Sequence, residues 1–174
     1  MKIVQVLGYS GSGKTRVITQ LTETLASRGS KVGVLKHLHD RAFTVDSRGK
    51  DTWKFARAGA SVIVASSPNE LAVIKRGSLK ENSIDNLIEI VRREGVEYLF
   101  IEGFYEEMEN YVSGKTILCA KTTKEAASLL VRHKGTPICI LVKSLKNLRS
   151  LGNPEIPFVR LPADTGLILK LIDS

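Results

Sequence analysis

Residues 2–15 read KIVQVLGYSGSGKT, an apolar run that leads directly into a glycine-rich segment and a Lys-Thr pair. The segment 8–15 fits the pattern G-x-x-x-x-G-K-[ST] of phosphate-binding loops. Apolar residues then recur at helical spacing from Val17 to Leu25, so the pattern stands between a predicted strand and a predicted helix, as this motif requires. The expected phosphate-binding residues are Gly8, Ser10, Gly11, Ser12, Gly13, Lys14 and Thr15.

The fixed positions of this loop each have a physical role. The glycines let the backbone curl so that successive N–H groups point at phosphate oxygens. The helix that begins near Gly13 adds the partial positive charge of its N-terminus. The Lys14 ammonium can reach the β and γ phosphates, which makes it a candidate catalytic residue, and the Thr15 hydroxyl can ligate Mg²⁺. The loop therefore predicts a nucleotide site that uses magnesium.

Strand-like and helix-like segments alternate along the rest of the chain. Strands are predicted at 31–37, 61–67, 71–77, 98–103, 116–121 and 136–143, and helices at 51–60, 83–95, 123–133 and 164–172. This alternation favours an α/β fold of the P-loop NTPase kind, with three layers and a mainly parallel sheet that carries helices on both faces. No linker or repeat divides the sequence, so we expect a single nucleotide-binding domain over residues 1–174.

Two acidic residues are candidates for the magnesium site. Glu102 ends the apolar run YLFIE, and ligands bind at the carboxyl ends of strands in open α/β sheets. We expect Glu102 to serve the metal or the attacking water, with a surface ion pair as the alternative. Asp46, in the segment DSRG, is the second candidate, although it follows the second strand. The guanine-reading pattern [NT]-K-x-D is absent from the sequence, so the motifs alone give no base preference.

The segment 36–51, KHLHDRAFTVDSRGKD, is polar and basic and has neither a helical nor a strand period. It follows the second strand, so we expect it to emerge at the same sheet edge as the phosphate-binding loop and to bind a second anion or a phosphoryl acceptor. A solvated loop is the alternative, and a metal site at its two histidines lacks a third ligand. Its candidate binding residues are Lys36, His37, His39, Asp46, Arg48 and Lys50, with Arg41 among them.

Charge and composition narrow the class of partner. The net charge is +8, of which residues 1–60 contribute +7. Nucleic acid is not the expected partner, because aromatic residues make up only 6% of the chain and form no stacking platform. No apolar run is long enough to predict a membrane span, and the start does not resemble a signal peptide, so we expect a cytoplasmic location. Cys119 and Cys139 lie in apolar runs and are expected to be buried, reduced thiols.

Three segments, in this order, resemble the molybdopterin-guanine dinucleotide biosynthesis protein B family. They are GYSGSGKT, KHLHDRAFTVDSRGKDTWKFARAGA and YLFIEGF, and the resemblance covers roughly residues 1–145. The middle segment is the most specific, because that family carries K-H-x-H, an Asp, G-K-D-[ST]-[WY] and A-G-A after its second strand. Two positions depart from the family: Asp40 stands where members often have another histidine, and Tyr105 stands where a lysine usually follows E-G-F.

The resemblance implies a P-loop protein that binds GTP with Mg²⁺, hydrolyses it weakly and is often homodimeric. It also implies an accessory role toward a partner enzyme, the molybdenum cofactor guanylyltransferase, which joins GMP to molybdopterin. Carried over by position, Gly11, Gly13, Lys14 and Thr15 would hold phosphate and Mg²⁺. Glu102 would serve the metal or the attacking water, and the basic segment would meet phosphate or the molybdopterin cofactor.

Two other functions stay open on the sequence alone. A small-molecule kinase would use the same phosphate-binding loop and hold an anionic acceptor in the segment 36–51, where Arg48 or Lys50 would stabilise the transferred group. A nucleic-acid-binding ATPase rests on charge alone and would bind generic DNA or RNA with a steep salt dependence. Slow hydrolysis is expected on chemical grounds too, because the sequence shows no clear residue to position an in-line water.

Overall fold

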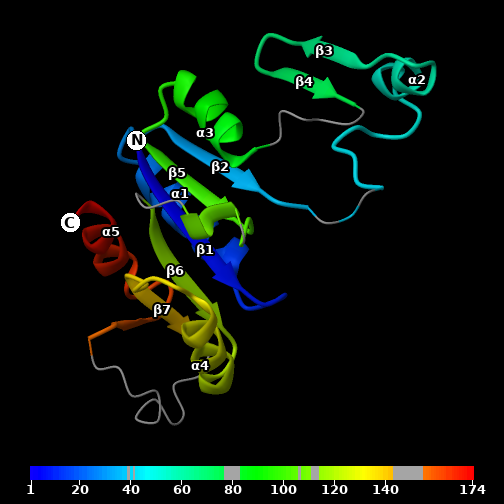
Figure 1. Ribbon diagram of the computed structural model, residues 1–174. Helices are drawn as coiled ribbons and strands as arrows, with labels where there is room; N and C mark the ends of the chain where they lie inside the picture. The colour runs from blue at the N-terminus through cyan, green and yellow to red at the C-terminus, as the bar shows by residue number, and fades with distance from the viewer. Residues whose placement is uncertain (39, 41, 77–82, 106, 111–113, 143–154) are drawn as a thin grey trace.

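The structure is a computed structural model that describes residues 1–38, 40, 42–76, 83–105, 107–110, 114–142 and 155–174 (Figure 1). The strands are β1 (Lys2–Gly8), β2 (Val32–Lys36), β3 (Val62–Ser66), β4 (Leu71–Lys75), β5 (Tyr98–Glu102), β6 (Lys115–Ala120), β7 (Cys139–Val142) and β8 (Phe158–Val159). The α-helices are α1 (Lys14–Ala26), α2 (Asp51–Arg57), α3 (Ile84–Arg93), α4 (Thr123–Arg132) and α5 (Thr165–Asp173), and a short 3₁₀ helix spans Glu107–Asn110.

A parallel six-stranded sheet forms the body of the protein, in the order β2-β5-β1-β6-β7-β8. β1 therefore lies between β5 and β6, with Val6 opposite Glu102 and Gly8 opposite Cys119. Because the strands are parallel, the carboxyl ends of these three strands meet at one edge of the sheet. The mainly parallel α/β architecture expected from the sequence is confirmed.

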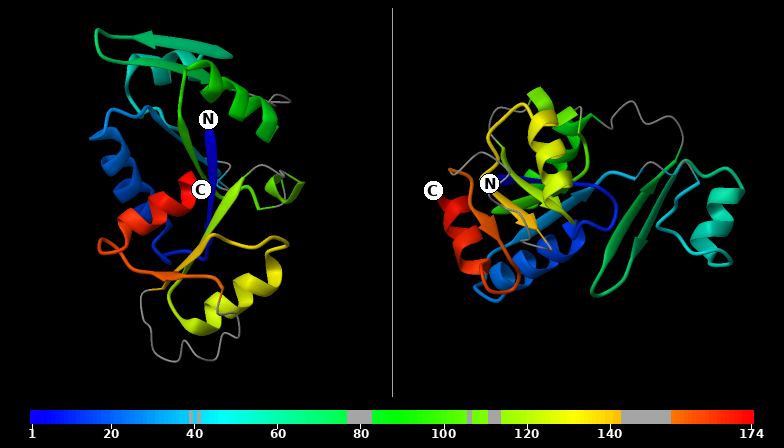
Figure 2. Two further views of the ribbon diagram at one scale, coloured as in Figure 1. Left: turned by 90° about the vertical axis from the view of Figure 1, so that its left-hand side faces the viewer. Right: turned by 90° about the horizontal axis from the view of Figure 1, so that it is seen from below.

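Helices cover both faces of this sheet (Figure 2). On one face, α1 and α5 pack against alternate residues of β1, such as Val4 and Val6, in a single apolar cluster. On the other face, α3 and α4 pack against Ile3 and Leu7 in two further clusters. Burial on both faces explains why the central strands read as almost continuous apolar runs. The three layers expected from the sequence are therefore present.

An arm projects from the body between β2 and α3, and we define it as residues 42–76 (Figure 1). In it, β3 and β4 form a separate antiparallel hairpin, and α2 contacts β3. The alternation of strands and helices expected along the whole chain is wrong here. Only residues 67–70 join the two strands, and a parallel pairing would need a crossover of about a dozen residues.

Most element boundaries lie within two residues of the sequence pattern, but α2 ends at Arg57 and not near residue 60, and β7 begins at Cys139 and not at residue 136. Ser83 caps α3 by accepting a hydrogen bond from the backbone N–H of Asn86. Asp51 does not cap α2, because it is already the first helical residue and Lys50 occupies the N-cap position. The strand β8 lies in the proline-rich segment, where the sequence predicts no strand, and has only two residues. No helix in the described segments is long and apolar enough to cross a membrane.

Candidate phosphate-binding site

The loop between β1 and α1 has the backbone that a phosphate-binding loop requires. Gly8, Gly11 and Gly13 have positive φ angles of 155°, 70° and 106°. At Gly8 a side chain is also excluded by space, because a Cβ there would lie 2.2 Å from the carbonyl oxygen of Cys119 on β6. Gly13 is the N-cap residue of α1, so the N-terminus of that helix opens onto the loop. We call residues 8–15 the P-loop.

Two lysine side chains lie against the P-loop. The ammonium of Lys14 donates hydrogen bonds to the carbonyl oxygens of Gly8 and Tyr9, at 3.0 and 3.1 Å. Lys121, the residue after β6, has its ammonium nitrogen 3.4 Å from the position that a Cβ on Gly11 would take. The positive charge at the loop therefore comes from two segments of the chain, and it suits a polyphosphate ligand.

A carboxylate from the neighbouring strand reaches the same place. The Oε2 atom of Glu102, at the end of β5, lies 3.4 Å from the Thr15 hydroxyl and 3.4 Å from the Lys36 ammonium. A cavity of about 320 Å³ opens beside these groups, between α1 and β2. A hydroxyl and a carboxylate that converge in this way suit Mg²⁺, which takes one or two protein oxygen ligands and completes its shell with water and phosphate.

The backbone after Glu102 is held from both sides. Gly103 and Phe104 have positive φ angles of 93° and 56°, and a Cβ on Gly103 would lie 2.9 Å from the Cβ of His37. The His37 ring stacks on the Phe104 ring with centroids 4.7 Å apart, and its backbone N–H donates to the Glu102 carbonyl at 2.9 Å. From the opposite side, the Gln5 amide donates to the carbonyl oxygens of Gly103 and Phe104. These contacts fix the direction in which the Glu102 side chain leaves the sheet.

The basic segment 36–51 divides between the body and the arm. Lys36 and His37 lie beside the end of β5, whereas Asp46, Arg48 and Lys50 lie in the arm before α2 (Figure 1). His39 and Arg41 fall outside the described residues. The structure therefore brings together the first two members of the predicted anion-binding set and separates them from the last three.

Asp46 is bound within the arm. Its carboxylate accepts hydrogen bonds from the Thr52 hydroxyl at 2.8 Å and from the backbone N–H of Ser47 at 2.9 Å. Its other oxygen lies 3.6 Å from the Arg76 guanidinium, next to the end of β4, and its side chain is only 4% exposed. A role of Asp46 in the magnesium site stays a prediction from the sequence, and it would require the arm to approach the P-loop.

Both cysteines are buried, free thiols, as expected. Burial raises the pKa of Cys119 and of Cys139 to about 12, so both stay neutral and neither is a nucleophile at pH 7. Within the described segments, no three side chains of His, Cys, Asp or Glu gather into a group that could hold a metal ion. The pair Thr15 and Glu102 thus remains the candidate magnesium site, because phosphate and water would supply its other ligands.

Two residues at this site are absent from the sequence predictions. Lys121 stands directly after the apolar run TILCA, and its place at the end of a strand is the signal that could have identified it. Gln5 interrupts the apolar run IVQVL, and a polar side chain in a buried central strand indicates that this side chain makes hydrogen bonds. Neither signal says which part of the chain these side chains reach.

The fold and the loop define the class of protein: the chain is a P-loop protein of the α/β type, a class that binds nucleotides. Within that class it belongs to the family of molybdopterin guanine dinucleotide synthesis protein B, whose family model matches residues 3–134. This match confirms the resemblance drawn from the three sequence segments.

Individual relatives agree with this family. The molybdopterin-guanine dinucleotide biosynthesis adapter protein of Haemophilus influenzae is 33% identical over 105 residues, which cover 60% of this chain and 58% of that protein. A putative adapter protein of the same name from Methanocaldococcus jannaschii is 26% identical over 133 residues, covering 76% of this chain and 53% of that protein. The matches thus span a little over half the length of these relatives.

Solved structures show the same fold. The MobB protein of Bacillus subtilis superposes with a TM-score of 0.77 at 24% sequence identity, and the alignment covers 98% of both chains. A MobB homologue from Bacillus stearothermophilus superposes with a TM-score of 0.71 at 18% identity over 99% of both chains. At this level of identity the likeness concerns the fold.

Proposed function

We propose that the protein binds GTP with Mg²⁺ at the P-loop, hydrolyses it slowly, and acts in the cytoplasm as an adapter to the guanylyltransferase that joins GMP to molybdopterin. The observation that carries this proposal is the meeting of Thr15, Glu102 and Lys36 beside the P-loop. Family membership supports the pathway, and the relatives named as adapter proteins support the role.

The loop would bind the phosphates through its backbone N–H groups, the N-terminus of α1, and the ammonium groups of Lys14 and Lys121. Thr15 and Glu102 would hold Mg²⁺, which supplies a Lewis acid to the phosphate oxygens when it is bound. The Oε2 atom of Glu102 is already engaged by the Thr15 hydroxyl and the Lys36 ammonium, so this oxygen is occupied and would not accept a proton from an in-line water. Slow hydrolysis follows from that arrangement.

The molybdopterin cofactor would bind next to the nucleotide, at the basic segment. β2 carries Lys36 and His37 to the sheet edge where the P-loop lies, and the chain then continues into the arm with Arg48 and Lys50. An anionic ligand between the body and the arm would meet positive charge from both. We include these four residues in the proposed cofactor site for that reason.

The arm would also join two copies of the chain. Val62, Val64, Leu71 and Val73 lie on one face of the hairpin and are 53–67% exposed, whereas Ile63, on the other face, is buried. A two-stranded ribbon with one open apolar face is unstable alone in water, and a second copy would cover that face with an equal one. This is the surface that we propose for a homodimer.

Calorimetric titration of GTP and of ATP, each with Mg²⁺, tests the nucleotide site. We expect selective GTP binding that falls by about tenfold or more in Lys14→Ala, because the substitution removes a charge-assisted phosphate contact. Lys170→Ala, which changes an exposed lysine on α5, is the matched control and should bind GTP normally.

Glu102→Gln should keep GTP binding and lose most GTP hydrolysis. Normal binding by Lys14→Ala, or full hydrolysis by Glu102→Gln, would remove that residue from its role.

Titration with purified molybdopterin cofactor separates the adapter from the kinase. The adapter predicts cofactor binding that is lost when Lys36, His37 and Lys50 are changed together to alanine. The kinase instead predicts ATP preference, no affinity for the cofactor, and nucleoside diphosphate production that depends on a small anionic acceptor. In a reaction with the guanylyltransferase, the unchanged protein should increase the attachment of GMP to molybdopterin, and the triple alanine variant should not.

Sedimentation velocity tests the dimer. We expect twice the chain mass of 19.1 kDa for the intact protein and a monomer for the double variant Val64→Glu/Val73→Glu. Ile90→Glu is the control, because Ile90 on α3 is 59% exposed and lies outside the arm. A monomeric intact protein, or a double variant that still dimerises, would contradict the proposed interface.

A further inference from the structure

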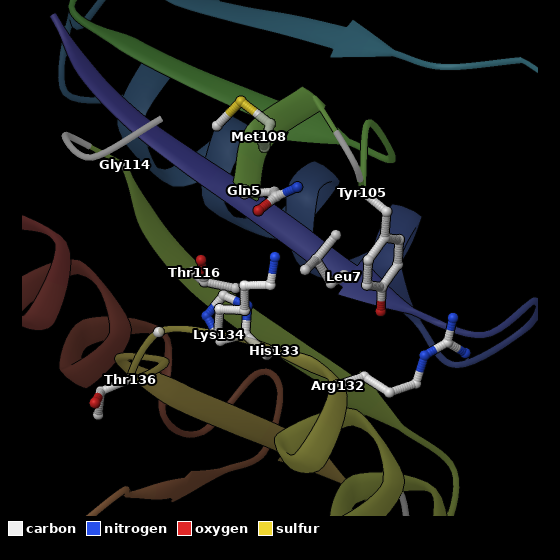
Figure 3. A pocket seen from close by; sticks show the side chains of 11 residues that line it. Gln5, Leu7, Tyr105, Met108, Gly114, Thr116, Arg132, His133, Lys134 and Thr136 are labelled. Carbon is white, nitrogen blue, oxygen red and sulfur yellow. The ribbon is translucent and has the colours of Figure 1, made fainter. Parts of the chain in front are cut away.

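Arg48 and Lys50 are the arm residues of the proposed cofactor site, and both lie in an exposed turn at residues 47–50. The backbone N–H of Lys50 closes this turn with a hydrogen bond of 3.2 Å, and Gly49 has a positive φ of 93°. Other cations of the chain face elsewhere: Arg132, for example, borders a cavity of about 260 Å³ over β1 and β6, on the face of the sheet that α4 covers (Figure 3). The direction in which the arm presents its charge therefore depends on how the turn 47–50 is held.

One carboxylate joins the two ends of this turn. The Oδ1 atom of Asp46 accepts hydrogen bonds from the backbone N–H of Ser47 at 2.9 Å and from the Thr52 hydroxyl at 2.8 Å. Asp46 precedes the turn, and Thr52 follows it in the first turn of α2. These two hydrogen bonds therefore fix the start and the end of the turn relative to each other.

Arg76 connects this carboxylate to the hairpin. Its guanidinium donates to the Thr44 hydroxyl at 3.2 Å and lies 3.6 Å from the Oδ2 atom of Asp46. The Thr44 hydroxyl in turn accepts the backbone N–H of Asp46 at 3.1 Å. The backbone N–H of Arg76 donates to the Ser61 carbonyl, where β3 begins and β4 ends. These contacts hold the turn against the hairpin.

The contact between Arg76 and Asp46 is poorly suited to stabilising the fold. The buried Oδ2 atom of Asp46 and the buried Nε atom of Arg76 have no hydrogen-bond partner among the described residues. An ion pair that leaves buried polar atoms unpaired recovers little of the free energy lost when its charges leave water. We therefore expect the pair to define the position of the carboxylate more than to add stability.

We propose that Arg76 is a positioning residue for the anionic ligand of the basic segment. It acts through Asp46 and Thr44 on the turn that carries the two cations, and this inference rests on the cofactor site proposed above. Side chains on a fixed turn lose less conformational freedom when they bind an anion, so Arg76 raises affinity without touching the ligand. In this role Asp46 acts inside the arm and does not need to approach the P-loop.

Backbone NMR relaxation of the ligand-free protein tests the structural part. The heteronuclear NOE of the Gly49 amide should fall in Arg76→Met, because methionine keeps an apolar side chain and loses every donor. Lys54→Met is the matched control, since it removes another cation of the arm, whose ammonium pairs with Asp51 at 2.9 Å on the surface. Its Gly49 amide should keep the value of the unchanged protein. A Gly49 amide that is unaffected by Arg76→Met, or affected equally by Lys54→Met, would overturn the proposal.

Calorimetric titration with purified molybdopterin cofactor tests the effect on the ligand. Arg76→Met should weaken binding about tenfold, and Arg76→Lys should restore part of it, because lysine keeps the charge and can donate to Thr44. Lys54→Met should bind normally. In a background where Arg48 and Lys50 are both alanine, Arg76→Met should cause no further loss, because a positioning residue acts only through the residues that it positions.

The outcomes separate this inference from the proposed function. An equal loss in the background without Arg48 and Lys50 would show a general structural role of Arg76 and would overturn the inference. Binding that depends on Arg48 and Lys50 but not on Arg76 would overturn the inference and leave the proposed cofactor site intact. Cofactor binding that depends on neither cation would remove the arm from that site, and the inference with it.

Discussion

Replacing Gln5 by leucine is expected to destabilise the fold by about 2 kcal/mol. Gln5 donates to the Gly103 carbonyl at 3.1 Å and to the Phe104 carbonyl at 3.2 Å. The Phe104 carbonyl also accepts from the backbone N–H of Met108, so only the Gly103 carbonyl loses its one described partner. One lost hydrogen bond costs about 1 kcal/mol, a carbonyl left unpaired costs about 1–3 kcal/mol, and the added apolar burial returns about 1 kcal/mol.

Urea unfolding at pH 7 measures this effect. With a slope of about 2 kcal/mol per molar urea, the midpoint should fall by about 1 M. Thr116→Val is the control, because Thr116 faces Gln5 in the sheet but its hydroxyl has no hydrogen-bond partner among the described residues, so its midpoint should change far less. An unchanged midpoint for Gln5→Leu, or an equal fall for Thr116→Val, would refute the view that Gln5 anchors the segment after Glu102.

Three further predictions concern other parts of the fold. Because burial raises the pKa of Cys119 and Cys139 to about 12, both thiols should resist Ellman's reagent at pH 8 in the native protein and react fully once it is unfolded; reaction in the native state would contradict their burial. The hydrogen bond from Lys2 holds the pKa of Asp173 below its ordinary value, so its contribution to stability is present above about pH 4 and is lost as the pH falls further. In acid unfolding, the stability of Asp173→Asn should therefore depend less on pH than that of the unchanged protein. Identical unfolding curves for the two proteins would contradict this contribution of Asp173. Ser83→Ala should lower the thermal midpoint, since a lost N-cap costs about 1 kcal/mol, whereas Ser83→Asn should retain it.

The sequence predicts the sheet well and the arm poorly, for a physical reason. A strand followed by a P-loop and a helix is specified locally, and so are the buried runs of β5 and β6. Residues 61–67 and 71–77 also read as strands, but nothing in them says whether they join the main sheet. The connection between them is too short for a parallel crossover, and the Ser67 N–H donates a hydrogen bond to the Glu70 carbonyl across it. The two strands therefore form an antiparallel hairpin.

The same distinction holds at the candidate site. Lys14 and Thr15 follow from the motif, and Glu102 follows from its place at the end of a strand. That Glu102 reaches Thr15 depends on β5 lying next to β1, and strand order is a property of long-range packing. Continuity along the chain suggested that Lys36 and Lys50 act together, but the path of the chain into the arm separates them in the structure.

The central place of β1 has a consequence for synthesis and turnover in the cell. Thr15 and Glu102 are 87 residues apart in sequence, and Lys121 comes from a third segment, directly after β6. A nascent chain whose β6 has not yet emerged from the ribosome therefore contains only part of the site. Nucleotide affinity then becomes a measure of completed folding. A ligand that binds only the native state stabilises it by mass action, so a nucleotide would protect the chain from proteolysis only once the sheet has closed around β1.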